Sequence, residues 1–95
     1  MAARFDLEMT LSREEFRRLL PGAVGSAPAE GEDGVFAGGE ASRRWTIRLV
    51  TLPDLRVGRI TLPRHRVEIR LEGYAEGEAE GFMARFHRGF QRGGG

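Results

Sequence analysis

The 95-residue sequence contains no cysteine, no lysine and no asparagine. Without cysteine, the chain can form no disulfide bond, no thiolate metal site and no cysteine nucleophile. Without lysine, it can neither form a Schiff base nor hold a phosphate in a lysine-containing P-loop. All fifteen basic residues are therefore arginines, whose planar guanidinium groups suit two-point contacts with carboxylate or phosphate.

Long apolar runs are also missing. No stretch approaches the roughly 20 residues that a membrane-spanning helix needs, and the first ten residues follow a strand pattern rather than that of a signal peptide. We therefore expect no membrane partner and a cytoplasmic location. The composition, 40% hydrophobic and 31% charged with a net charge of +1, is that of an ordinary globular domain. We expect one domain over residues 1–92 and a frayed tail over 93–95.

The N-terminal segment combines a strand pattern with a helix start signal. Apolar and polar residues alternate from Phe5 to Leu11, which predicts a strand with one buried face. Ser12 and Glu15 have the spacing of a capping box, in which each side chain can satisfy a free backbone N–H of the first turn. The helix that begins there is predicted to end at residues 21–22, a Pro-Gly pair.

Residues 21–42 differ in composition from the rest of the chain. They include six glycines, two prolines and four acidic residues, but no basic residue. Val35 and Phe36 are the only residues predicted to anchor this segment, as a short strand. We predict that residues 21–42 form a flexible loop inside the domain.

The segment 43–72 alternates apolar and charged residues, which is typical of strands with one buried face. The pattern predicts a three-strand meander over residues 44–52, 55–62 and 67–72, with turns at 53–54 and 63–65. In the middle strand, Val57 and Ile60 cannot share a face unless a bulge at Gly58 shifts the alternation.

A final helix is predicted after Gly73. Its apolar residues form one stripe at helical spacing: Ala75, Ala79, Phe82, Met83, Phe86 and Phe90. Acidic residues lie toward the predicted N-terminus of this helix and arginines toward its C-terminus, an order that complements the helix dipole. Because the helix is expected to extend past the sheet, we predict that Phe90 is only half covered. Phe90 and Arg88 are then candidate contacts for a partner.

Together these patterns predict an α+β domain with the order strand, helix, short strand, three strands, helix. The expected arrangement is a single mainly antiparallel sheet with both helices packed on one face. The opposite face would meet solvent and carry a set of arginines with two glutamates beside them: Arg44, Arg48, Arg66, Arg70, Glu68 and Glu72.

The sequence predicts no catalytic site, no cofactor and no metal site. His65, in a predicted turn, and His87, in the last helix, have no partner at metal-ligand spacing. We therefore expect a small non-catalytic intracellular interaction or accessory module. It would present a sheet edge or its last helix to an unknown protein partner, or to a second copy in a homodimer.

An alternative hypothesis of a different class is RNA or DNA binding. Segment 43–72 has eight arginines against three acidic residues, and guanidinium groups on one sheet face could contact a phosphate backbone. The residues that would do so are Arg44, Arg48, Arg66 and Arg70. Pairing of these arginines across strands with Glu68 and Glu72 would count against this hypothesis.

Overall fold

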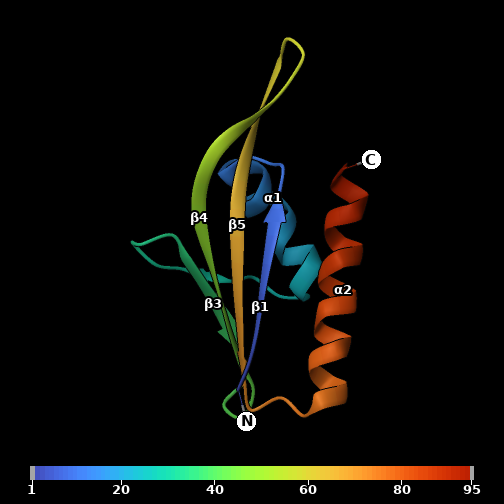
Figure 1. Ribbon diagram of the computed structural model, residues 1–95. Coiled ribbons are helices and arrows are strands. Elements are labelled where there is room, and N and C mark those ends of the chain that lie inside the picture. The colour runs from blue at the N-terminus through green and yellow to red at the C-terminus, as the bar shows by residue number, and fades with distance from the viewer. Residues whose placement is uncertain (1, 95) are drawn as a thin grey trace.

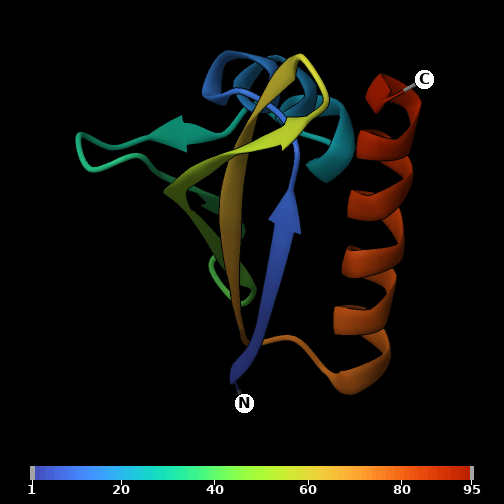
Figure 2. The ribbon, with the colours of Figure 1, turned by 45° about the horizontal axis from the view of Figure 1, so that its top comes forward.

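A computed structural model describes residues 2–94, with side chains described through residue 91. It shows the predicted α+β fold, with one antiparallel five-stranded sheet and two helices on one face of it (Figure 1 and, in a turned view, Figure 2). The elements are β1 (Ala2–Met9), α1 (Arg13–Val24), β2 (Ala29–Glu30), β3 (Val35–Gly39), β4 (Arg44–Val57), β5 (Ile60–Glu72) and α2 (Glu76–Gly94). The strand order in the sheet is β1-β5-β4-β3-β2.

The core lies between the sheet and the helices, and the predicted alternation is confirmed. The inward apolar residues in the body of β4 and β5 are buried: Trp45, Ile47, Leu49, Val67, Ile69 and Leu71. From the helices come Phe16, Leu20, Ala23, Ala79, Met83, Phe86 and Phe90. Burial of this much apolar surface is the main stabilising contribution to the fold, at about 25 cal/mol for each Å² removed from water.

α1 begins as predicted but ends later. The side chain of Ser12 accepts a hydrogen bond from the Glu15 N–H at 3.1 Å. Pro21 lies inside the helix, which continues to Gly25, a left-handed cap residue with φ of 81°. The predicted end at residues 21–22 is therefore wrong. The reason is that Ala23 in the last turn is buried, and its packing outweighs the backbone hydrogen bond that proline cannot donate.

Residues 21–42 contain more regular structure than their composition predicted. They include the last turn of α1 as well as β2 and β3, and Phe36 of β3 is buried as an anchor. Arg17 of α1 forms a two-point ion pair with Glu30 of β2, at 2.8 and 2.7 Å. This contact lowers the pKa of the Glu30 carboxyl below its ordinary value. The flexibility predicted for this segment stays a prediction.

The predicted three-strand meander is wrong, because two long strands take its place. β4 runs through residues 53–54 and β5 runs through 63–65, so neither predicted turn exists. The chain reverses at Gly58-Arg59, where Gly58 has a φ of 60°. A glycine at the first central position is what a two-residue hairpin turn of type II′ requires. The predicted bulge at Gly58 is also wrong, since the register shift lies between Leu52 and Leu55.

α2 follows Gly73 as predicted and runs to Gly94. Gly95, the last residue of the predicted frayed tail, lies outside the described residues. α2 packs against α1 through a close contact between Gly89 and Ala23. In the described part of the chain, neither helix is long and apolar enough to cross a membrane.

Candidate functional site

The end of the β4–β5 hairpin, residues 52–64, projects from the body of the protein, and we call it the arm. Figure 1 shows the arm extending past both helices. β1 pairs with β5 only from His65 onward, and β3 pairs with β4 only up to Arg48. Within the described residues, the two strands of the arm therefore pair only with each other.

A bulge decides which side chains share a face of the arm. Two residues of β4, Pro53 and Asp54, lie opposite the single residue Pro63 of β5. The cross-strand pairs of the arm are Leu52–Arg64, Leu55–Leu62, Arg56–Thr61 and Val57–Ile60. Paired residues point to the same face of a sheet. The extra residue in β4 therefore brings the leucines and the two tip residues onto one side of the ribbon.

We call this side the apolar face of the arm: Leu52, Leu55, Val57, Ile60 and Leu62, with Arg64, the partner of Leu52, at its base. Val57 is 56% exposed and Ile60 is 59% exposed, and they are the exposed large hydrophobic residues of the described chain. The three leucines are half-buried. The other side of the ribbon carries Arg56 and Thr61, both exposed. Adjacent apolar residues exposed at a projecting tip are typical of an interaction site.

The predicted exposure of Phe90 is wrong. Phe90 is only 6% exposed, and its ring stacks on that of Phe16 with a centroid distance of 5.0 Å. The prediction failed because α2 does not extend past the sheet (Figure 1), and α1 packs against α2 and covers Phe90. Arg88 is exposed and lines a groove between α1 and α2. Its role as a partner contact stays a prediction.

The four arginines of the candidate nucleic-acid face point to solvent, as predicted: Arg44, Arg48, Arg66 and Arg70. Arg44 pairs across strands with Glu72, and Arg48 with Glu68. The same two glutamates also form ion pairs along β5. Arg66 Nε lies 3.0 Å from Glu68 Oε2, and Arg70 Nε lies 3.3 Å from Glu72 Oε1. Each of these arginines thus has a glutamate beside it.

β1 adds three charges to this face that sequence reasoning missed. Arg4 lies opposite Arg70, Asp6 opposite Glu68, and Glu8 opposite Arg66. The face therefore has five arginines and four acidic residues: Arg4, Arg44, Arg48, Arg66, Arg70, Asp6, Glu8, Glu68 and Glu72. The signal for β1 was present in its alternation, but nothing in the sequence indicated that β5 would be its neighbour.

The two histidines do not form a common site. His65 lies in β5 rather than in a turn and is buried, with Nδ1 2.9 Å from the carbonyl oxygen of Leu11. Because a carbonyl can only accept, the His65 Nδ1–H donates this bond and ties β5 to the start of α1. His87 is exposed on α2 beside the ring edge of Phe86.

Across the residues that the structure describes, no three metal-ligating side chains are grouped together. Comparison of the chain with protein families, with curated proteins and with solved structures found no match. The function must therefore be inferred from the surfaces themselves, and the arm is the most distinctive of them.

Proposed function

We propose that this protein is a small intracellular, non-catalytic interaction module that self-associates through the apolar face of the arm. The observation that carries the proposal is the pair Val57 and Ile60, which lie opposite each other at the tip with more than half of each side chain's surface in water. The half-buried leucines extend the same surface toward the body.

A second copy of the chain is the partner that fits the arm best. A two-stranded ribbon is marginally stable in water, and it gains stability when another layer covers its apolar face. The helices cover the body of the sheet but do not reach the arm (Figure 1). Two arms related by a twofold axis would each supply the missing layer. Arg56, on the opposite side of the ribbon, would stay in water.

Face-to-face packing is better supported than pairing of strand edges. Pro53 and Pro63 lie in the two strands of the arm, and proline has no N–H to donate to a neighbouring strand. Prolines and charged residues on free strands oppose the edge-to-edge addition of another chain. We therefore expect contact between side chains rather than a continuous intermolecular sheet.

Nucleic-acid binding, the alternative hypothesis, has less support. A phosphate backbone is attracted by a surplus of positive charge, and the nine charges of the arginine face nearly cancel. The charged residues of this face include no aromatic residue. The single Trp and the single Tyr lie on the helix side of the sheet, beside Phe82 of α2. Stacking of bases on that face is therefore unsupported as well.

Size-exclusion chromatography with light scattering, from low to high micromolar concentration, tests the proposal. We expect a dimer for the native chain and a monomer for the double variant Val57→Thr with Ile60→Thr, which keeps β-branched residues in the strands. Arg56→Thr, on the opposite side of the arm, is the matched control and should still dimerise. A native chain that stays monomeric at high micromolar concentration would disprove self-association, and a double variant that dimerises normally would disprove the role of the arm.

A further inference from the structure

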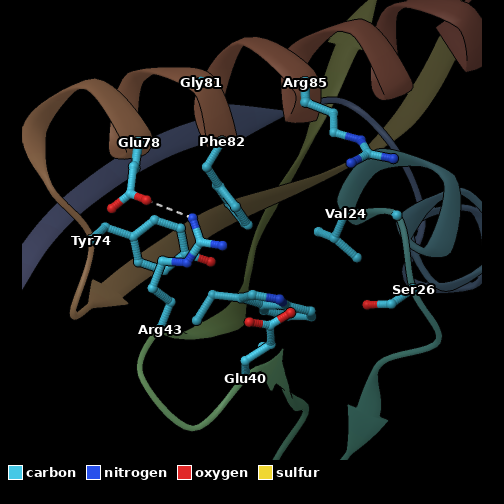
Figure 3. A pocket seen from close by; sticks show the side chains of 12 residues that line it. Val24, Ser26, Glu40, Arg43, Tyr74, Glu78, Gly81, Phe82 and Arg85 are labelled. Atoms are coloured by element: carbon cyan, nitrogen blue, oxygen red, sulfur yellow. Dashed lines mark hydrogen bonds and ion pairs between the residues drawn. The ribbon is translucent and has the colours of Figure 1, made fainter.

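A cavity of about 470 Å³ lies at the end of the hairpin opposite the arm, beside Trp45 near the start of β4. Figure 3 shows the side chains that line it. Three segments line it: the end of α1 at residues 24–26, the β3–β4 connection with the strand residues beside it at 39–45, and the first half of α2 with Tyr74, two residues before it. Pockets of this size commonly hold small organic ligands. Neither the arm nor the arginine face contributes to it.

One wall of the cavity is aromatic. The ring centroid of Phe82 lies 6.2 Å from that of Trp45 and 5.8 Å from that of Tyr74, which it meets edge to face. Figure 3 shows the Phe82 side chain pointing from α2 into the cavity. Phe82 and Tyr74 are only partly buried, so this wall has apolar surface that a flat ligand could cover.

The Tyr74 end of the cavity carries one paired arginine and two glutamates. Arg43 forms an ion pair with Glu78 at 2.7 Å, and its guanidinium lies over the Tyr74 ring, 5.8 Å from the centroid. Glu78 also accepts the Ala75 N–H at 2.9 Å, which caps α2. Glu40 lines the cavity at the same end, on the β3–β4 connection (Figure 3). Because both glutamates are negative and Arg43 is already paired, this end of the cavity would repel a negatively charged ligand group.

Arg85 lines the other end, and its charge is not paired. It makes no ion pair with any carboxylate of the described residues. Its guanidinium lies against Gly25, so closely that a β-carbon at that position would overlap it. Figure 3 shows Arg85 reaching from α2 toward the end of α1, near Ser26. A guanidinium held in this way can bind a carboxylate through two parallel hydrogen bonds.

We propose that this cavity binds a small organic carboxylate with a flat apolar body. The apolar body covers the exposed surfaces of Phe82 and Tyr74, and the carboxylate pairs with Arg85. Glu40 and Glu78 at the far end repel the carboxylate, which fixes the orientation of the ligand. Binding is non-covalent and independent of the arm.

Trp45 provides a local readout, because it is the only tryptophan in the sequence and forms part of the cavity wall. The probe is 3-phenylpropanoate, with excitation at the red edge of tryptophan absorption, where a phenyl group does not absorb. We expect a saturable change in tryptophan fluorescence. The neutral analogue 3-phenylpropan-1-ol and the ringless anion acetate should each bind at least about tenfold more weakly, since each lacks one of the two contacts. No saturable change with 3-phenylpropanoate, or equal binding of the alcohol, would overturn the proposal.

Gly81 and Gly77 give a matched pair of variants that separates binding from folding. Gly81 lines the cavity and Gly77 does not, while a β-carbon would meet nothing within 4 Å at either position. Both Gly81→Leu and Gly77→Leu should stabilise α2, because leucine is the better helix former. Only Gly81→Leu fills the cavity, so it should abolish the fluorescence change while Gly77→Leu retains it. Unchanged binding by Gly81→Leu would overturn the proposal.

Arg85 and Arg88 give a second pair, which tests the charge. They lie three residues apart on α2, and Arg88 lines the neighbouring groove rather than the cavity. Arg85→Gln should weaken the binding of 3-phenylpropanoate at least about tenfold. Arg88→Gln should change it by no more than about twofold, because Arg88 is exposed and does not line the cavity. Equal weakening by the two variants would show general charge attraction and overturn the assignment to Arg85. Dimerisation of the native chain is measured separately, and its failure would leave this test unaffected.

Discussion

Gly89 of α2 lies directly against Ala23 of α1, and a β-carbon built on Gly89 would be 2.6 Å from both the Cα and the Cβ of Ala23. The two helices can approach this closely only because residue 89 has no side chain. The contact lies next to the stacked rings of Phe16 and Phe90. A glycine that weakens an isolated helix thus permits the packing that covers the core.

This contact predicts opposite effects for two glycine-to-alanine substitutions in the same helix. Gly89→Ala should destabilise the protein by about 1–3 kcal/mol, because the added methyl group overpacks the interface with α1. Gly77→Ala should stabilise it by up to about 1 kcal/mol, because alanine is the better helix former and position 77 faces open space. Urea unfolding followed by circular dichroism measures both. Stabilisation by Gly89→Ala would contradict the close contact.

The burial of Phe90 predicts a large effect of truncating it. Phe90→Ala should lower the free energy of unfolding by about 3–5 kcal/mol, as expected for a phenylalanine removed from a packed core. The exposed Val57 provides the comparison, since Val57→Ala in the monomer at low concentration should change it by no more than about 0.5 kcal/mol. Equal small effects of the two substitutions would mean that Phe90 is exposed in solution.

Tyr74, the only tyrosine in the sequence, should titrate above the ordinary tyrosine pKa. Burial of the phenol is the main cause of the raised pKa, and the nearby Arg43 opposes it. The ultraviolet absorbance of the tyrosinate reports this pKa directly. Arg43→Gln should raise it further, because the substitution removes the opposing positive charge. A pKa at or below that of free tyrosine would contradict the burial.

The raised pKa of Tyr74 also has a consequence for stability. The folded protein holds this proton more tightly than the unfolded chain, whose tyrosine pKa is about 10. The contribution of Tyr74 to stability is therefore complete below that pH and is lost as the pH rises through the folded-state pKa. Unfolding curves of the native chain and of Tyr74→Phe should accordingly diverge only on the alkaline side.

The paired charges of the arginine face predict weak, unspecific contact with nucleic acid. A labelled single-stranded oligonucleotide should bind the native chain no more tightly than it binds Arg48→Gln, within about twofold, and with a shallow dependence on salt. Fluorescence anisotropy at low and at moderate salt measures both. Tight binding at low salt with a steep salt dependence, lost in Arg48→Gln, would instead support the nucleic-acid hypothesis.

Several features could be predicted because they depend on near neighbours in the chain. Alternation correctly assigned Trp45 and Ile47 to the core and Arg44 and Arg48 to solvent, since successive residues of a strand point to opposite faces. The N-terminal cap of α1 at Ser12 could also be predicted, because the hydrogen bond from the Glu15 N–H to Ser12 Oγ joins residues only three apart. The sequence therefore correctly predicted that the arginines of this face point to solvent.

The structure of the arm could not be predicted from near neighbours in the sequence. Pro53-Asp54 is as suitable for a turn as for a bulge, and only the pairing of Leu52 with Arg64 and of Leu55 with Leu62 shows that it is a bulge. That pairing depends on β5, which lies further along the chain. The apolar face of the arm thus follows from a register that no local pattern contains.

Sequence spacing alone thus established β1, the start of α1, the presence of α2 and the inward or outward direction of most side chains in the body of the sheet. Backbone geometry imposes these features over a few residues. Folding in three dimensions determined the rest: that Glu8 meets Arg66, that α1 covers Phe90, and that Arg85 reaches Gly25. Each of these contacts joins segments distant in the chain. Their formation depends on how the helices and strands pack together, and the net charge of a surface or the shape of a cavity follows only from that packing.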